Sequence, residues 1–127
     1  MDEAGMVLRN DGFEVEEVAR FVCGEDVRSM LIGTDDEGNV MVREDISGPS
    51  ALVAYGQNAR SLRVRFDASQ VEGLLAAVGA SVAATSLCEY VADENRDVLD
   101  LMDLCDREGI VYQFTSMEPA GTASLRG

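Results

Sequence analysis

The sequence contains no lysine and no histidine, and these two absences exclude much of the usual enzyme chemistry. Histidine is the side chain whose ordinary pKa lies nearest neutrality, and lysine forms Schiff bases and binds phosphate as a point charge. The remaining catalytic options are a lone cysteine or a pair of carboxylates, and any two of the 24 acidic residues would supply such a pair. That pattern has no specificity, so the sequence favours a protein that is not an enzyme.

Positive charge is also scarce, because ten arginines face 24 carboxylates and the net charge is −14. Direct binding of DNA or RNA is disfavoured, since phosphate neutralisation supplies most non-specific affinity. Three explanations of the charge compete: an acidic interaction surface, adaptation to high intracellular salt, and a composition bias that replaces lysine by arginine. The bias explains the acid excess less well, and three cysteines and six methionines fit a salt-adapted protein poorly. The sequence therefore favours an acidic surface that binds a basic partner.

Long apolar runs, a basic leader and metal-ligand spacings are missing too. We expect no membrane span, no signal peptide and a cytoplasmic protein. Cys23, Cys88 and Cys105 are widely spaced among apolar neighbours, which predicts three reduced, inert thiols in the core. Residues 93–104 resemble a calcium loop at the first, third and fifth positions only, since Val98 stands in place of glycine and Leu104 in place of glutamate. We expect neither metal nor cofactor.

The apolar periodicity predicts an α+β fold. Apolar residues at i, i+3, i+4 and i+7 indicate a helix over 13–23 and another over 94–107, and a capping box of Ser69 and Glu72 indicates a helix ended by Gly79. Alternating or short apolar runs around turn residues indicate hairpins over 27–33 with 40–44 and 51–55 with 61–66, and single strands over 82–91 and 110–115. We expect one two-layer domain over 1–127, with a frayed tail over 117–127. Its mixed, mostly antiparallel sheet would have about five to six strands and about three helices.

The most distinctive local pattern is an aspartate at every third position of the helix expected over 94–107. Three residues advance a helix by about 4.5 Å and rotate it by about 300°, so the series winds slowly along the side opposite the apolar residues. This acidic stripe consists of Asp93, Asp97, Asp100, Asp103 and Asp106. A row of carboxylates resembles a row of phosphates, so we expect an inhibitor or regulator that mimics nucleic acid on the basic surface of a nucleic-acid-binding protein. A solvated helix face is the alternative.

Arginines gather only once, in the second expected hairpin. Arg63 and Arg65 are two residues apart and share one strand face, where guanidinium groups bind phosphate or carboxylate with two hydrogen bonds. A site for an anionic ligand is therefore the second hypothesis. Its residues are Tyr55, Arg60, Arg63 and Arg65. Cross-strand pairing of these arginines with Glu44 or Asp45 is the alternative.

Overall fold

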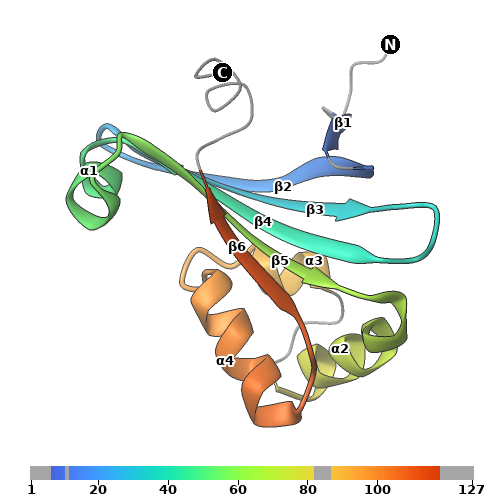
Figure 1. Cartoon of the computed structure of the whole chain (residues 1–127). Helices are drawn as coiled ribbons and strands as arrows, with labels where there is room; N and C mark the ends of the chain where they lie inside the picture. Colours follow the sequence, from blue (N-terminus) through green and yellow to red (C-terminus); the bar gives the residue numbers. More distant parts are fainter. Residues whose placement is uncertain (1–6, 11, 82–86, 118–127) are drawn as a thin grey trace.

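The computed structural model describes residues 7–10, 12–81 and 87–117, which form one sheet and four helices (Figure 1). The strands are β1 (Val7–Asn10), β2 (Phe13–Cys23), β3 (Asp26–Thr34), β4 (Val40–Ser47), β5 (Ala59–Phe66) and β6 (Gln113–Met117). The helices are α1 (Pro49–Tyr55), α2 (Ala68–Ser81), α3 (Leu87–Val91) and α4 (Val98–Glu108). The strands lie in chain order, and every neighbouring pair is antiparallel. The α+β prediction is confirmed, although the described sheet has no parallel pair.

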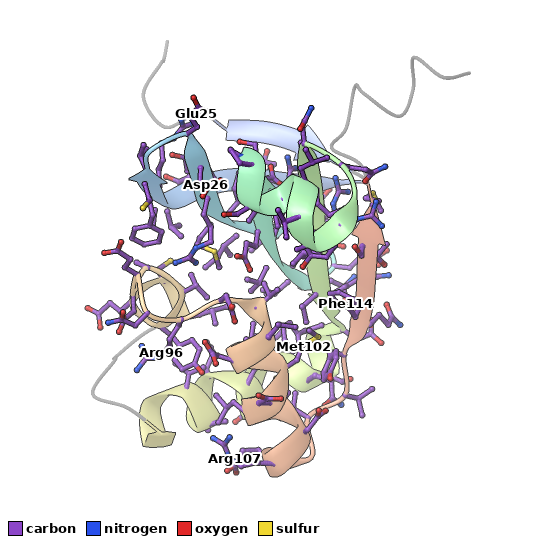
Figure 2. All side chains as sticks on the ribbon, turned by 90° about the vertical axis from the view of Figure 1, so that its left-hand side faces the viewer. Glu25, Asp26, Arg96, Met102, Arg107 and Phe114 are labelled. Carbon is purple, nitrogen blue, oxygen red and sulfur yellow. The ribbon has the colours of Figure 1, made fainter. Side chains whose placement is uncertain are left out.

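Helices α2, α3 and α4 lie on one face of the sheet, because all three are inserted between the neighbouring strands β5 and β6 (Figure 1). The space between these two layers is filled by side chains of both, as Figure 2 shows around Met102. Val42 and Phe66 from the sheet and Leu74 and Leu101 from the helices are almost completely buried there. Burial of each such side chain stabilises the folded state by about 1.5–3 kcal/mol. Helix α1 stands apart at one end of the sheet (Figure 1).

Residues 13–23 are a strand and not the helix that their apolar spacing indicates. The register of β2 against β3 shifts between Glu17 and Ala19, where a β-bulge adds one residue to β2. Val15 therefore lies on the open face of the sheet, whereas Ala19 packs against the core under the helices. One extra residue converts a period of two into a spacing that resembles a helical turn. The helix prediction was wrong for this reason.

Two other segments were assigned the wrong element. Residues 51–55 belong to helix α1, with Pro49 in its first turn, and strand β5 pairs directly with β4, with Ser47 opposite Ala59. The expected strand over 82–91 is contradicted at its described end, where Leu87–Val91 is helix α3. Short apolar runs of four to eight residues are compatible with either element, so periodicity alone does not decide between them.

The other elements confirm the prediction within a few residues. The hairpin of β3 and β4, the helices α2 and α4, and the final strand β6 all lie where the pattern places them. The cap of α2 differs: Ser69 is already inside the helix, and the side-chain oxygen of Asn39 accepts a hydrogen bond from the backbone N–H of Ala68 at 2.8 Å. Of the tail expected over 117–127, Met117 ends β6 and residues 118–127 lie outside the described residues.

Candidate functional site

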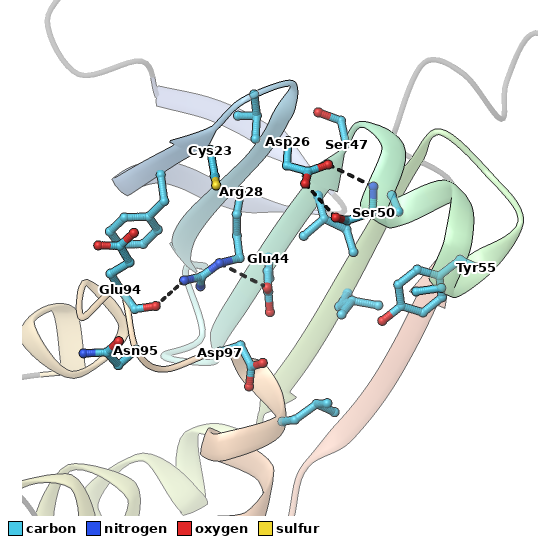
Figure 3. A pocket seen from close by; sticks show the side chains of 17 residues that line it. Cys23, Asp26, Arg28, Glu44, Ser47, Ser50, Tyr55, Glu94, Asn95 and Asp97 are labelled. Carbon is cyan, nitrogen blue, oxygen red and sulfur yellow. Dashed lines mark hydrogen bonds and ion pairs between the residues drawn. The ribbon is translucent and has the colours of Figure 1, made fainter.

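A cavity of about 530 Å³ lies where helix α1, the ends of strands β2, β3 and β4, and residues 94–97 meet (Figure 3). Its apolar wall includes Phe21, Ile46 and Leu62, and its polar wall is mainly acidic. The carboxylates that line it are those of Asp26, Glu44, Glu94 and Asp97, and Arg28 is the one cationic side chain in the lining. The cavity is therefore suited to a ligand with a cationic group on an apolar stem.

Glu44 is the most unusual residue in the cavity, because it is charged and only 4% exposed. One carboxylate oxygen, Oε1, accepts a hydrogen bond of 3.0 Å from the backbone N–H of Val98 at the start of α4. The other oxygen, Oε2, faces Arg28 Nε at the long distance of 3.8 Å (Figure 3). Burial raises the pKa of Glu44, and the Asp97 and Asp100 carboxylates raise it further against the opposing effects of Val98 and Arg28. A cationic donor in the cavity would favour the ionised form.

Arg28 neutralises Glu44 only in part, because the terminal nitrogens of its guanidinium group bind other acceptors. Nη2 donates a hydrogen bond of 2.6 Å to the carbonyl oxygen of Glu94, and Nη1 donates one of 2.9 Å to that of Arg96 (Figure 3 shows the former). The guanidinium carbon also lies 4.6 Å from the centre of the Phe21 ring. Arg28 thus fastens the segment before α4 to the sheet and forms a fixed wall of the cavity.

Helix α1 is fastened to the opposite wall by Asp26. Its Oδ1 accepts a hydrogen bond of 2.9 Å from the backbone N–H of Ser50, and its Oδ2 accepts one of 2.6 Å from the Ser50 hydroxyl (Figure 3). These hydrogen bonds lower the pKa of Asp26. Tyr55 at the end of α1 and Leu99 at the start of α4 line the cavity and are about half exposed, so they form its rim.

The sequence analysis did not identify this site, although a signal was present. Glu44 follows Val40 and Val42 at a spacing of two, so it occupies the same face of β4 as two apolar residues. A single charge on the apolar face of a strand indicates either a buried ion pair or a binding group. The partners of Glu44, Arg28 and Val98, are 16 and 54 residues away in the sequence, and no local pattern connects them.

Of the predicted acidic stripe, Asp100, Asp103 and Asp106 lie on α4, Asp97 is its N-cap and Asp93 precedes it; Asp97 is the member that meets the cavity. Asp97 lines the cavity and caps the helix: its side chain accepts a hydrogen bond from the backbone N–H of Asp100, and the Asp100 side chain accepts one from that of Asp97. Asp103 is exposed, and its side chain has no hydrogen bond or ion pair with another described residue. Asp100 and Asp103 are thus exposed, whereas Asp97 is partly buried, and Asp97 and Asp100 also form the cap of the helix.

The two ends of the stripe are engaged by neighbouring residues. Asp93 forms an ion pair of 3.3 Å with Arg96, and the exposed Asp106 accepts a hydrogen bond of 2.9 Å from the Tyr112 hydroxyl. Asp100 and Asp103, with Asp97 beside the cavity, are the part of the stripe that remains presented to a partner.

The predicted arginine site is not assembled as a group of four. Arg60 points to the helix side of the sheet and donates hydrogen bonds to Gln57 and Ser116, whereas Tyr55 belongs to α1 and the first cavity. Arg63 and Arg65 lie together on the opposite face, where they line a second cavity of about 230 Å³. Tyr55 and Arg60 must therefore be removed from the predicted site.

Pairing of these arginines with the preceding strand is also not as expected. The register places Glu44 opposite Leu62 and Asp45 opposite Ser61, and Asp45 binds Arg43 of its own strand. Arg65 lies 3.8 Å from Asp67 instead.

Two of the three cysteines are not in the core. Cys105 is completely buried, and this burial raises its pKa to about 11. Cys23 and Cys88 are exposed, and Cys23 lines the cavity beneath α1. Their apolar neighbours misled the prediction, because Cys23 ends a strand and Cys88 lies on the outer side of a five-residue helix.

No family model matches the chain, and neither the curated proteins nor the solved structures contain a match. Within the described ranges, no three side chains of histidine, cysteine, aspartate or glutamate converge as ligands for a metal ion. The longest described helix, α2, has 14 residues, so none of these helices has the length and apolar character needed to cross a bilayer.

Proposed function

We propose that the protein is a non-catalytic binding protein that recognises a basic segment of another macromolecule and acts as its inhibitor or regulator. One arginine or lysine side chain of the partner enters the cavity beneath α1, with its charged end toward Glu44 and its aliphatic stem against the apolar wall. The observation that carries the proposal is the buried Glu44 carboxylate, whose Oε2 has only a long contact with Arg28. A cationic donor is the group that stabilises such an oxygen.

The acidic stripe extends this site along α4. Asp97 belongs to both the cavity wall and the stripe, so the negative potential continues from the cavity to Asp100 and Asp103. Further basic residues of the same partner segment would lie along these carboxylates. Exposed charges of this kind act mainly on the rate of association, whereas the buried carboxylate acts on the lifetime of the complex. A partner that normally binds nucleic acid has the required basic surface, which is how the protein would mimic nucleic acid.

The test uses argininamide and lysinamide as probes and measures their binding to the whole chain by calorimetry. We expect saturable binding that Glu44→Gln weakens by about tenfold, since the variant keeps the shape and loses the charge. Glu37→Gln is the matched control, because Glu37 is exposed in the β3–β4 turn. Equal affinity of the wild type and Glu44→Gln for both probes would contradict the proposal.

The pH dependence of this binding has a defined sign. The pKa of Glu44 is raised above its ordinary value of 4.5, so the empty protein holds its proton to a higher pH than an exposed glutamate does. Probe affinity should rise as the pH increases from 4.5 and Glu44 ionises, and the Glu44→Gln variant should lack this rise. The stability of the unliganded wild type should change in the opposite direction over the same interval, because ionising a buried carboxylate is unfavourable.

A further inference from the structure

The face of the sheet opposite the helices carries three arginines in adjacent positions. Arg43 of β4 is the direct cross-strand partner of Arg63 of β5, and Arg65 follows on the same face two residues later. Arg43 and Arg63 are 7% and 5% exposed. Like charges placed directly opposite each other destabilise a sheet unless other groups compensate for them. Three of the ten arginines of an acidic chain therefore occupy one small area.

The positive charges of Arg43 and Arg65 are not equally neutralised by the other described residues. Asp45 accepts three hydrogen bonds of 2.6–3.1 Å from Arg43 and neutralises that guanidinium group. Arg65 has a 3.8 Å ion pair with Asp67, a contact of 5.8 Å with the ring centre of Phe13, and a weaker electrostatic attraction to Asp35, whose pKa it helps to lower. Its Nε is buried and has no hydrogen-bond partner among the described residues. A buried donor without an acceptor is unfavourable, and the oxygen of a bound anion would satisfy it.

Beside Arg65 lies the second cavity, of about 230 Å³. Its polar lining consists of Arg63, Arg65, Gln113, Thr115 and the carboxylate of Asp35. The Asp35 oxygens already accept hydrogen bonds from the backbone N–H groups of Glu37 and Asn39 and from the Asn39 side chain, so that carboxylate is engaged by its own turn. The other polar groups of the lining can all donate hydrogen bonds: the Arg63 and Arg65 guanidinium groups, the Gln113 amide and the Thr115 hydroxyl.

We propose that this cavity binds a phosphate group, either as inorganic phosphate or as a small phosphate monoester. The Arg65 guanidinium group, whose buried Nε has no hydrogen-bond partner among the described residues, supplies N–H donors to a tetrahedral oxyanion. Thr115 and Gln113 add a hydroxyl and an amide, and Arg63 lines the same cavity. The net charge of −14 does not prevent this, because screening limits exposed charges to a range of about 8–10 Å. The site lies on the opposite face from the cavity that contains Glu44, so it does not rest on the proposed function.

The experiment titrates inorganic phosphate and, separately, phenyl phosphate into the whole chain at constant ionic strength, with calorimetry and ³¹P NMR as readouts. We expect saturable binding at millimolar concentrations or tighter, and a higher melting temperature at saturation. Arg65→Gln should weaken binding by about tenfold, and it is chosen because Arg65 is partly exposed, so its loss should leave the fold intact. Arg20→Gln, an exposed arginine paired with Glu17 on β2, should bind phosphate as the wild type does.

Two further measurements make the result decisive. Thr115→Val removes a hydroxyl from an exposed residue and should weaken phosphate binding by a smaller factor than Arg65→Gln. Glu44→Gln should leave phosphate binding unchanged, so failure of this proposal is distinguishable from failure of the proposed function. Absence of saturable phosphate binding to the wild type, or an equal affinity of the wild type and Arg65→Gln, would overturn the site. Tighter binding of phenyl phosphate than of inorganic phosphate would identify a monoester as the ligand.

Discussion

On the helix-covered face of the sheet, Glu44 places a carboxylate among apolar side chains, whereas on the opposite face Arg43 and Arg63 place two guanidinium groups side by side. These residues come from neighbouring positions of the same two strands, and the pleat alone sends them to opposite faces. Each face thus buries charge of one sign next to a cavity of its own. The net charge of −14 describes neither cavity, because burial and immediate neighbours determine what each one attracts.

The largest expected effect concerns Gly48, which precedes helix α1 and so positions the α1 residues that line the first cavity. Gly48 has a φ of 111°, and a Cβ there would overlap the carbonyl oxygen of Glu25 and lie 2.7 Å from the Asp26 carboxylate. Gly48→Ala should therefore destabilise the fold by about 3 kcal/mol in urea unfolding, and probe binding at Glu44 should weaken as α1 is displaced. Phosphate binding on the opposite face should be unchanged in the folded fraction.

Gly56→Ala is the matched control for that variant. Gly56 ends α1 with a φ of 73°, but a Cβ there would have nothing within 4 Å. The expected loss of about 1 kcal/mol comes from the backbone conformation alone. Equal destabilisation by the two variants would show that the close approach of Gly48 to Glu25 does not hold α1 in place.

A smaller effect is expected on the face of the sheet opposite the helices, which carries Arg43. Among the described residues, Asp45 is the only carboxylate that accepts hydrogen bonds from both Nε and Nη2 of Arg43. Asp45→Asn would leave Arg43 opposite Arg63 without that neutralisation, and should destabilise the fold by about 2 kcal/mol. Phosphate should recover more stability in this variant than in the wild type, which is measured as the difference in melting temperature with and without phosphate. An equal phosphate effect in both proteins would mean that the charge of Arg43, which does not line the cavity, has no influence on the anion site.

Some elements of the fold could be predicted from the sequence and others could not. Helix α4 follows from its apolar repeat, and the β3–β4 hairpin follows from two short apolar runs around a cluster of turn residues; together they indicate the α+β class. Strand β2 could not be recognised, since its bulge at Glu17–Ala19 depends on pairing with β3. Helix α1 could not be recognised either, because seven residues contain too few turns to establish a period.

The candidate sites differ in the same way: residues with a local sequence pattern were predicted, and residues that depend on tertiary contacts were not. Arg63 and Arg65 were correctly placed on the same face of the sheet, because they belong to one strand and alternate with Leu62 and Val64. Arg60 was included in the predicted site, although its spacing of three from Arg63 already places it on the other side of the strand. Glu44 was missed as a site residue, because its role depends on the position of α4 relative to β4, which is a tertiary contact.

The smallest effect on stability is expected for Asp103→Asn, and this variant tests the acidic face most directly. The Asp103 side chain is exposed and has no hydrogen bond or ion pair with another described residue, so its free energy of unfolding should change by less than about 0.5 kcal/mol. Asp97→Asn and Asp100→Asn are less suitable, because both residues form the cap of α4. Asp36→Asn, an exposed acid in the β3–β4 turn, is the matched control.

Stopped-flow measurements with an arginine-rich peptide at two salt concentrations distinguish the explanations of the charge. If the stripe guides a basic partner, Asp103→Asn should slow association at low salt, the control should not, and the difference should vanish at high salt. If the charge is an adaptation to salt, the wild-type fold should instead gain stability as salt rises, with equal association rates for the three proteins. Equal rates at low salt would assign Asp103 to a solvated helix face and leave Glu44 as the group that recognises the partner.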